Sequence, residues 1–517
     1  MSDAAGDLTD ARGMSLLMAA GVVSAAEIAA ALLTRIEETD VGPDGIRSVL
    51  EVNPEAVREA KRLDAERVAG APRSPLHGVP VLIKDNIDTA APLHTTAGSW
   101  TLHGTAPVAD APLVRRLRDA GMVILGKANL SEWANYRSTH STSGWSAVGG
   151  LTRNPWDRTR SAGGSSSGSA AALAGGLAPL SIGTETDGSI VCPAAFCGVV
   201  GLKPTLGLVP TAGVVPISRS QDSVGPMART VRDAAVLLAA LTGSGPDTYL
   251  PLTATGAHPL RGLCIGVPRP GIWTDNAQVA AAVDAALGVL AAAGATIVDE
   301  VRVPSLERLD PADELAVLDH EFKVGLAAYL ATRRGDVPRT MAEVISSNRE
   351  HAGVELVHFD QDILERCDRT TGLTAPEYVA ARQRCVDASR ANGIDAVLAE
   401  HRLDVLVMPS GDPAWLIDLE HGDGGPPSTE SDLDAEVDRP GASTLPAMAG
   451  YPIVTVPCGL VEGLPVGVAF TGPAGSDGLL LRIADAYEVA AFGPAGATAA
   501  LASNRQPDSA LPPHPQR

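Results

Sequence analysis

The pattern of hydrophobic and polar positions begins with helical spacing. Up to about residue 70 the apolar residues recur every three or four positions, as in the run through Leu33 and Ile36. Ser24–Glu27 is a capping box ahead of that run, and Asn53-Pro54 is typical of a second N-cap followed by proline at the first helical position. We therefore expect residues 1–70 to form helices that wrap the outside of a core.

From about residue 78 the pattern changes to short apolar runs separated by helical segments. Residues 78–83 and 122–125 predict strands, with a helix over 110–120 between them. Residues 274–400 are mainly helical in pattern. Further strands are expected at 404–409, 452–458 and 466–470, and a closing helix at 477–490. This alternation predicts an α/β fold: a single large α/β/α domain over 71–500, with a central twisted mixed β-sheet covered by helices.

Two segments lack any apolar period. Residues 417–440 form an acidic insertion rich in glycine and proline, which predicts a mobile loop. Residues 501–517 form a proline-rich tail, which predicts disorder. No repeat and no long linker divides the core.

Composition and charge then exclude several kinds of partner. The 517 residues are 45% hydrophobic and carry a net charge of −21, whereas a face that binds phosphates needs clustered lysine and arginine. We therefore expect no nucleic acid and no membrane as partner. The acidic N-terminus has no signal-peptide pattern and no apolar run reaches about 18 residues, so a cytoplasmic location is expected. The six cysteines show no C-x-x-C pair, which favours free thiols and no metal site.

Lys84 is the first candidate for chemistry, because it directly follows the apolar run 78–83. Such a lysine is commonly a solvent-facing strand end. If it were buried instead, desolvation would lower its pKa from about 10.4, and the neutral amine could accept a proton from a serine.

The serine-rich stretch S-A-G-G-S-S-S-G-S-A-A at 161–171 is the second candidate. It reads as a glycine/serine turn with a helix N-cap, or as a G-x-S-x-G nucleophile elbow over Gly164–Gly168. The elbow would need an acid and then a histidine further along the chain. The downstream histidines do not follow predicted strands, and this disfavours a Ser-His-acid esterase.

The third candidate is the segment G-T-E-T-D-G-S-I at 183–190, which leaves an apolar run. Gly188 before Ser189 allows a turn that aims several backbone N–H groups at one point, as an oxyanion hole requires. By itself the segment could equally be an ordinary surface turn.

Together these segments resemble the amidase signature family. The matching text is P-L-H-G-V-P-V-L-I-K-D-N at 75–86, A-G-G-S-S-S-G-S-A-A at 162–171 and G-T-E-T-D-G-S-I-V-C-P-A-A-F-C-G-V-V-G-L-K-P-T at 183–205. Residues 220–231 and 445–457 also fit. The matches run in order over most of the chain, and 274–400 matches least.

The resemblance implies an amide hydrolase with a Ser–cis-Ser–Lys triad and an acyl-enzyme. Ser189 would be the nucleophile, Ser165 the bridging serine, joined to the next residue by a cis peptide bond, and Lys84 the final base. The backbone N–H groups of Thr186, Asp187, Gly188 and Ser189 would form the oxyanion hole. The residues expected to support this geometry are Gly163, Gly164, Ser166, Gln221, Asp222 and Arg229.

Two departures from the family pattern concern the site itself. Ser167 stands where the family commonly has glycine, and Thr186-Asp187-Gly188-Ser189 replaces the common x-Gly-Gly-Ser. A carboxylate beside a forming oxyanion would be unfavourable unless it points away or is held by donors. With the segment 129–138, this variant is similar to the peptide amidase branch, and the possible pocket walls are Asn129, Trp133, Tyr136 and Trp145.

The expected substrate is an amidated peptide or another small amide, with no cofactor and no metal, in a monomer or homodimer. The alternatives within the same resemblance are an amidotransferase A-type subunit that releases ammonia for transamidation, and a binding protein on an inactive amidase scaffold. The acidic balance disfavours the first. The presence of Lys84, Ser165 and Ser189 together disfavours the second.

Overall fold

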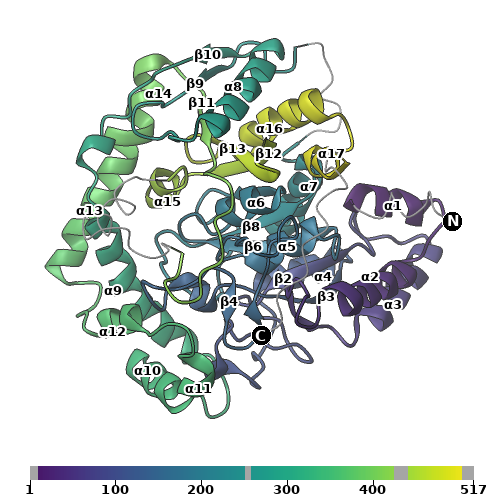
Figure 1. Cartoon of the computed structure of the whole chain (residues 1–517). Helices are drawn as coiled ribbons and strands as arrows, with labels where there is room; N and C mark the ends of the chain where they lie inside the picture. Colours follow the sequence, from purple (N-terminus) through teal and green to yellow (C-terminus); the bar gives the residue numbers. More distant parts are fainter. Residues whose placement is uncertain (1–9, 251–257, 424–440, 504–517) are drawn as a thin grey trace, which may run out of the picture.

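The short apolar runs of the chain form one mixed sheet of 11 strands, shown in a computed structural model that describes residues 10–250, 258–423 and 441–503 (Figure 1). The strand order is β1-β3-β2-β6-β8-β7-β12-β13-β11-β9-β10. The strands are β1 (Val49–Val52), β2 (Pro80–Lys84), β3 (Val123–Ala128), β6 (Leu180–Glu185), β7 (Val200–Lys203), β8 (Ser223–Ala228), β9 (Cys264–Gly266), β10 (Thr296–Val298), β11 (Val405–Pro409), β12 (Ile453–Val461) and β13 (Leu464–Thr471). A separate small ribbon pairs β4 (Trp145–Ser146) with β5 (Gly150–Leu151).

The register of the parallel strands decides where the chemistry lies. Strand β2 is parallel to both β3 and β6, and Val81 is level with Ile124 on one side and Leu180 on the other. Parallel strands that start level also end at the same edge of a sheet. The last residue of β2, Lys84, and the turn after Glu185 therefore lie at one edge, although about 100 residues separate them.

Helices cover both faces of the sheet, as the α/β/α prediction requires. Helices α5 and α6 pack on one face, and α4, α7, α8 and α16 on the other. Strands β2, β3, β6, β8 and β13 are buried at every residue, which explains their continuous apolar runs. The bounds are α4 (Pro112–Asp119), α5 (Ser167–Ala174), α6 (Val191–Cys197), α7 (Val231–Thr242), α8 (Ala277–Ala292), α16 (Asp477–Phe492) and α17 (Ala497–Ser503).

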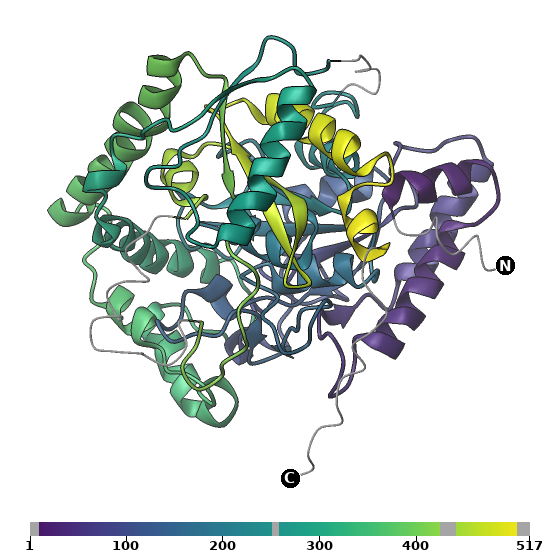
Figure 2. The same ribbon diagram turned by 45° about the horizontal axis from the view of Figure 1, so that its top comes forward.

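The N-terminal helices lie together beside the sheet, as Figure 2 shows in purple. They are α1 (Ala11–Ala19), α2 (Ala25–Thr39) and α3 (Ala56–Val68). The capping box is confirmed, because Ser24 and Glu27 exchange side-chain and backbone hydrogen bonds.

Two expectations for this region are corrected. The second N-cap was misplaced: α3 begins at Ala56, and the Asn53 side chain accepts the Glu55 N–H at 2.9 Å in a turn before it. The first 70 residues are also not purely helical, since β1 pairs with β3 and forms one edge of the sheet.

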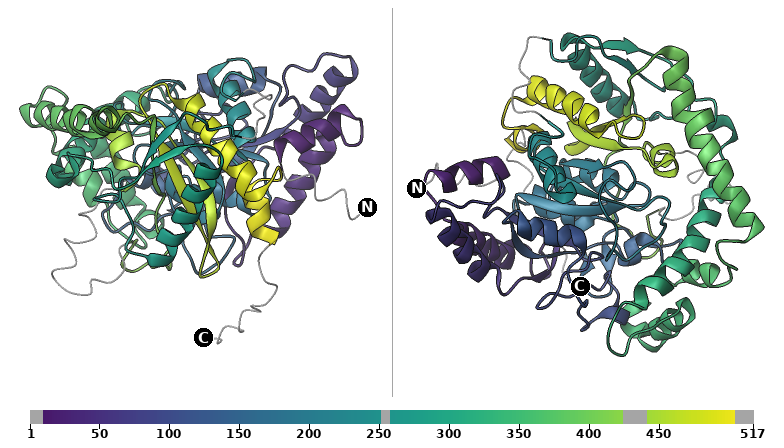
Figure 3. Two further views of the ribbon diagram at one scale, coloured as in Figure 1. Left: turned by 90° about the horizontal axis from the view of Figure 1, so that it is seen from above. Right: turned by 180° about the vertical axis from the view of Figure 1, so that it is seen from behind.

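The mainly helical prediction for 274–400 is confirmed. The helices that follow α8 form an arc on the side opposite α1–α3 in both views of Figure 3. The arc consists of α9 (Pro311–Leu330), α10 (Met341–Glu350), α11 (Ala352–Glu355), α12 (Asp362–Asp368), α13 (Pro376–Ser389) and α14 (Asp395–His401). Helix α15 (Thr444–Ala449) packs against α13. Short 3-10 or π turns lie at η1 (Trp100–Leu102), η2 (Glu132–Asn135), η3 (Leu306–Arg308) and η4 (Arg390–Ile394).

A buried ion cluster joins this arc to the segment after β3. The Arg137 guanidinium donates to Glu132 at 2.7 Å and to Glu355 at 3.2 Å, and all three side chains are at most 1% exposed. Glu355 also accepts from the Ser99 hydroxyl at 2.7 Å. The guanidinium lies 4.1 Å from the centre of the Phe359 ring. Every charge in the cluster therefore has partners, as burial requires.

Most of the acidic insertion, 424–440, and nearly all of the proline-rich tail, 504–517, lie outside the described residues. The prediction of a mobile loop and the prediction of a disordered tail therefore stay predictions. Over the described ranges, none of the helices has the length and apolar character needed to cross a lipid bilayer.

We expect Glu355→Ala to lower the free energy of unfolding by about 3–5 kcal/mol, because it leaves Arg137 buried without its full set of partners. Glu365→Ala is the matched control, since that carboxylate pairs with Arg349 on the surface, where a pair contributes about 0–1 kcal/mol. Urea unfolding of both variants measures the difference. Equal losses would contradict the assigned role of the cluster.

Candidate active site

Lys84 ends strand β2 and its side chain is fully buried. The Nζ atom lies 2.8 Å from Ser165 Oγ and 2.9 Å from Ser166 Oγ. It also lies 3.1 Å from the Thr184 carbonyl oxygen and 2.9 Å from the Thr184 hydroxyl. The solvent-facing alternative for this lysine is thus wrong, because strands on both sides and the serine-rich loop enclose it.

The environment of Lys84 favours the neutral amine. Burial lowers the pKa of Lys84 well below its ordinary value, and the negative charges of Glu185 and Asp222 oppose that effect only in part. No carboxylate makes an ion pair with Lys84 within the described part of the chain. The lowered pKa makes a neutral amine, which can accept a proton from a hydroxyl that contacts it, easier to form than for an exposed lysine.

The serine-rich loop runs into helix α5 and brings Ser165 and Ser166 to Lys84. The peptide bond between Gly164 and Ser165 is cis. The expected cis bond was placed one residue too late, after Ser165, and the structure corrects this. Ser167, the unusual residue of the loop and the first residue of α5, donates its hydroxyl to the Gly163 carbonyl and so ties the start of the helix to the loop before it.

Close packing explains the double glycine before these serines. A Cβ at Gly164 would lie 2.3 Å from Ser131 Oγ, and Gly163 has a φ of 70° with Pro193 backbone atoms 2.9 Å from a Cβ position. A larger residue would push the loop away from α6 and from the segment after β3. The glycines thus hold Ser165 where Lys84 reaches it.

The turn between β6 and α6 carries Ser189. Glu185, the last residue of β6, accepts the N–H groups of Ile190 at 2.6 Å and Val191 at 2.9 Å. Ser189 is 9% exposed, and its carbonyl accepts the Ser166 N–H at 3.1 Å. The Glu185 carboxylate thus joins the two ends of the turn. The hydrogen bond from the Ser166 N–H to the Ser189 carbonyl places the turn beside the serine-rich loop.

Four backbone donors in this turn are free. The N–H groups of Thr186, Asp187, Gly188 and Ser189 donate to no acceptor among the residues that the structure describes. Gly188 has a φ of 77°, a conformation that favours glycine. Neighbouring unpaired donors in one turn can bind a negative charge together.

Asp187 departs from the family pattern, and its carboxylate would repel a forming oxyanion if it pointed toward it. Its carboxylate interacts with the hydroxyls of Ser443 and Thr444 at the start of α15. These contacts lower its pKa, whereas burial, the larger effect, raises it. The acid is therefore engaged by hydroxyl donors on a neighbouring segment.

The three supporting residues expected around 220–229 have different contacts. Asp222 accepts the Thr186 hydroxyl at 2.6 Å and the N–H groups of Ile217 and Ser218, and burial raises the pKa of Asp222 to about 6. The Gln221 Nε2 lies 3.4 Å from the Thr186 carbonyl. Arg229 instead donates to the Leu173 carbonyl at 2.9 Å, at the far end of α5.

The residues expected as pocket walls are all buried by other parts of the protein. Trp133 and Tyr136 join the apolar cluster under α9, α10 and α12, where the Tyr136 hydroxyl donates to Asp319. Trp145 packs edge-on against Phe359. The Asn129 amide bonds to the Thr152 hydroxyl, to Ser146 and to two backbone carbonyls. Residues of the 274–400 region thus cover the three aromatic side chains, whereas Asn129 joins segments within residues 47–152.

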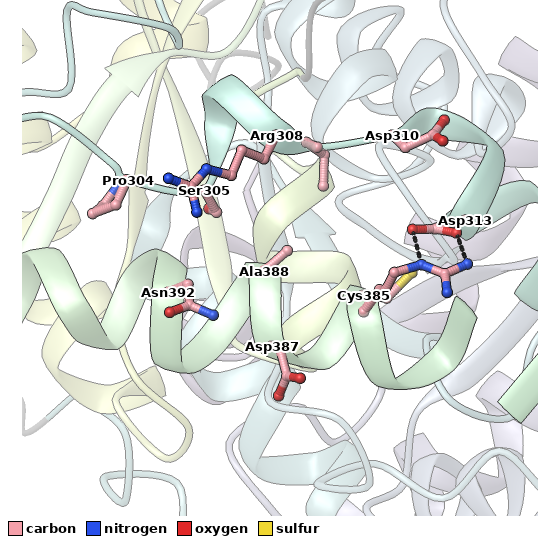
Figure 4. A pocket seen from close by; sticks show the side chains of 11 residues that line it. Pro304, Ser305, Arg308, Asp310, Asp313, Cys385, Asp387, Ala388 and Asn392 are labelled. Carbon is pink, nitrogen blue, oxygen red and sulfur yellow. Dashed lines mark hydrogen bonds and ion pairs between the residues drawn. The ribbon is translucent and has the colours of Figure 1, made fainter. Parts of the chain in front are cut away.

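Two cavities show where space lies relative to these groups. A small one is lined by Thr184, which contacts Lys84, and by Asn86, Ala134, Thr186, Thr211, Val214, Val215, Ile217, Asp222, Ser223 and Val224. A larger pocket lies on the outside of α9 and α13 (Figure 4). The carboxylates of Asp360 and Asp362 with the His140 ring bring ligand atoms within 4.8 Å of one another, but two of these residues are exposed and such groups are common without an ion.

Sequence reasoning missed Thr184, Glu185 and Glu314. Thr184 and Glu185 stand inside the motif G-T-E-T-D-G-S, so their nearness to Ser189 was a usable signal. Glu314 lies on α9 and accepts from Gln221 at 2.7 Å. Nothing in its local sequence marks it, because its partners come from segments about 90 residues away.

Comparisons with known proteins show which family the chain resembles over most of its length. A sequence model of the family described as Amidase matches residues 27–481. The peptide amidase of Stenotrophomonas maltophilia is 44% identical, with a TM-score of 0.83 over 93% of this chain and 97% of that one. A peptide amidase solved with the competitive inhibitor chymostatin gives the same values. The A-type subunit of the glutamyl-tRNA(Gln) amidotransferase of Symbiobacterium thermophilum is 38% identical over 93% of this chain and 96% of its own length.

We expect Glu185→Ala to destabilise the protein by about 2–5 kcal/mol, because it leaves the N–H groups of Ile190 and Val191 buried without an acceptor. Glu185→Gln is the matched control, since its amide oxygen can still accept. Urea unfolding of both variants tests this. A Gln variant as unstable as the Ala variant would show that the negative charge, and not the acceptor, matters.

Proposed function

This chain belongs to the amidase signature family, and we propose that it cleaves small carboxamides, amidated peptides among them, through Ser189, Ser165 and Lys84. Membership of the family makes the chain an amidase, a hydrolase of C–N bonds. The observation that carries the proposed relay is the 2.8 Å contact of the buried Lys84 amine, whose pKa burial lowers, with Ser165.

The proposed first half-reaction forms an acyl-enzyme. Ser189 Oγ attacks the amide carbonyl carbon as its proton passes to Ser165, and the Ser165 proton passes to the Lys84 lone pair. The C–N bond then breaks, and the proton held by Lys84 returns through the serines to the leaving nitrogen. Ammonia or an amine leaves, and Ser189 carries the acyl group as an ester.

The second half-reaction repeats these transfers with water. Water gives a proton through the same relay to Lys84, and the resulting hydroxide attacks the ester carbonyl. The Ser189–acyl bond breaks, and the proton returns to Ser189. One water is consumed, and a carboxylic acid and an amine are formed, so the relay ends in its starting state.

The free N–H groups of Asp187, Gly188 and Ser189 support the assignment of the oxyanion hole. In each half-reaction the carbonyl oxygen becomes negatively charged in the tetrahedral intermediate. Donors already fixed beside the nucleophile stabilise that charge without reorganising. The hydroxyls of Ser443 and Thr444 engage the Asp187 carboxylate and thereby reduce its repulsion of the same charge.

The 44% identity to a peptide amidase supports an amidated peptide or a similar small amide as the substrate. The relatives among the amidotransferase A-type subunits favour a second candidate, in which the chain releases ammonia from glutamine for transamidation. The two candidates differ in what the isolated chain does, because hydrolysis of simple amides needs no partner protein.

We expect Ser189→Ala to lower kcat by at least about a thousandfold, because the acyl-enzyme can no longer form. The measurement is ammonia release from an amidated peptide, with mass spectrometry of the trapped acyl adduct. An active Ser189→Ala variant would contradict the assigned nucleophile.

Because Lys84 contacts two serines, Ser165→Ala and Ser166→Ala form a matched pair. We expect the larger loss of kcat in Ser165→Ala, as the bridge in the relay. If Ser166→Ala were inactive and Ser165→Ala active, the bridge would have to be reassigned to Ser166.

Lys84→Ala should lose most activity and regain part of it at high pH, where hydroxide removes the proton.

The substrate is tested by ammonia release from N-acylated amino acid amides, short aliphatic amides, aryl amides and glutamine. We expect turnover of amidated peptides by the isolated chain. Turnover of glutamine only, or turnover that requires added partner proteins, would favour the amidotransferase candidate.

A further inference from the structure

Helix α9 reaches the turn of Ser189 through one glutamine. The Nε2 of Gln221 donates to Glu314 at 2.7 Å and lies 3.4 Å from the Thr186 carbonyl. The Thr186 hydroxyl is held separately by Asp222 at 2.6 Å. Thr186, which begins the turn, is thus held by the neighbouring residues Gln221 and Asp222, and Gln221 is held in turn by Glu314 of the helical arc.

The Thr186 carbonyl belongs to the same peptide group as the Asp187 N–H. In a trans peptide the C=O and N–H bonds point in opposite directions, and the group is planar. Fixing the carbonyl on the Gln221 side therefore fixes the direction of the Asp187 N–H on the other side. That N–H is one of the free donors assigned to the oxyanion hole.

The groups around Gln221 contain more acceptors than donors. Within the described residues, Asp187 Oδ1 and Gln221 Oε1 are buried atoms without a hydrogen-bond donor. An ionised Glu314 would add two more acceptor oxygens and no donor. A protonated Glu314 supplies one O–H donor while its other oxygen still accepts from Gln221.

The electrostatics of Glu314 agree with the protonated form. Burial and then the nearby charge of Asp187 raise the pKa of Glu314 to about 8, against the lowering effect of the Gln221 hydrogen bond. Neither Glu314 nor Asp187 makes an ion pair over the part of the chain that is described. Charged groups that interact with Asp187 are Lys203 and Glu185, and Cys385 interacts with Glu314. The groups around these are Asp222, Asp313, Glu321, Tyr378, Arg382 and Arg384.

We propose that Glu314 is a positioning residue for the nucleophile turn: as a neutral acid it donates toward Asp187, accepts from Gln221, and so fixes the Thr186–Asp187 peptide. The catalytic half of this inference rests on the proposed function. Glu314 touches no reacting atom in it and acts through Gln221 and Asp187. Loss of its proton would remove the donor to Asp187 and place a second negative charge beside the Asp187 carboxylate, which would push that residue and its peptide group away from the observed position.

This role predicts the sign of the pH dependence. Glu314 is neutral below about pH 8 and ionises as the pH rises through that value. The kcat of the wild type should therefore fall as the pH rises above about 8. Asp222, with a pKa of about 6, titrates on the acidic side and does not account for the fall.

Three variants separate these effects. Glu314→Gln cannot ionise, so the fall in kcat above about pH 8 should disappear. Glu314→Ala removes the acceptor and the donor, and kcat should fall about tenfold with KM within about twofold, as expected for contacts that act on the transition state. Asp313→Asn is the control: this neighbouring carboxylate faces the outer pocket and pairs with Arg384, as Figure 4 shows, and its pH profile should match the wild type.

A stability measurement tests the proton without any turnover. Between the ordinary pKa of a glutamate and about 8 the folded chain keeps a proton that the unfolded chain has lost, so its stability falls as the pH rises. The unfolding midpoint of Glu314→Gln should rise relative to wild type from about pH 5 to about pH 9.

Each outcome decides one statement. An alkaline fall that persists in Glu314→Gln, or an unchanged kcat in Glu314→Ala, overturns the positioning role. A midpoint difference that stays constant with pH overturns the neutral acid. A chain without amidase activity at any pH counts against the proposed function, and the midpoint measurement then decides on the proton of Glu314.

Discussion

An amine that is shielded from water must find its hydrogen-bond partners inside the protein, and Lys84 finds them on two segments that are far apart in sequence. Ser165 and Ser166 come from the loop before α5, and Thr184 from strand β6. The parallel register of β2 with β6 makes this meeting possible, because both strands end at one edge of the sheet. The same burial disfavours the charged form of the amine and so lowers the pKa of Lys84.

The turn that carries Ser189 is held by three acidic residues, each further away in the sequence than the one before. Glu185 holds it locally through two N–H groups of α6. Asp222 holds Thr186 from the loop before β8. Glu314 reaches it through Gln221 from the helical arc. Helix α9 lies in the segment whose sequence matched the family motifs least. Through Gln221 it nevertheless connects to the turn where the oxyanion is expected to form.

Much of this could be predicted from residues close to one another in the chain. The strand runs, the capping box at Ser24 and the helices of 274–400 follow local patterns, and the structure confirms them. The aromatic residues after β3 could not be placed in this way. Trp133 and Tyr136 stand beside a motif, but residues about 180 positions away cover them, and a burial partner leaves no mark on the local sequence.

The sequence by itself determined the fold class, the family and the residues that could carry chemistry, because apolar period, glycine spacing and motif order are all local. Only the tertiary structure decided which of those groups meet. It buried Lys84 against Ser165, placed the cis bond before that serine, turned the Asp187 side chain toward Ser443 and Thr444, and brought Glu314 to Gln221. The reason is physical: hydrogen bonding and desolvation depend on distances in space, and the chain fixes those distances only when the sheet and its helices pack together.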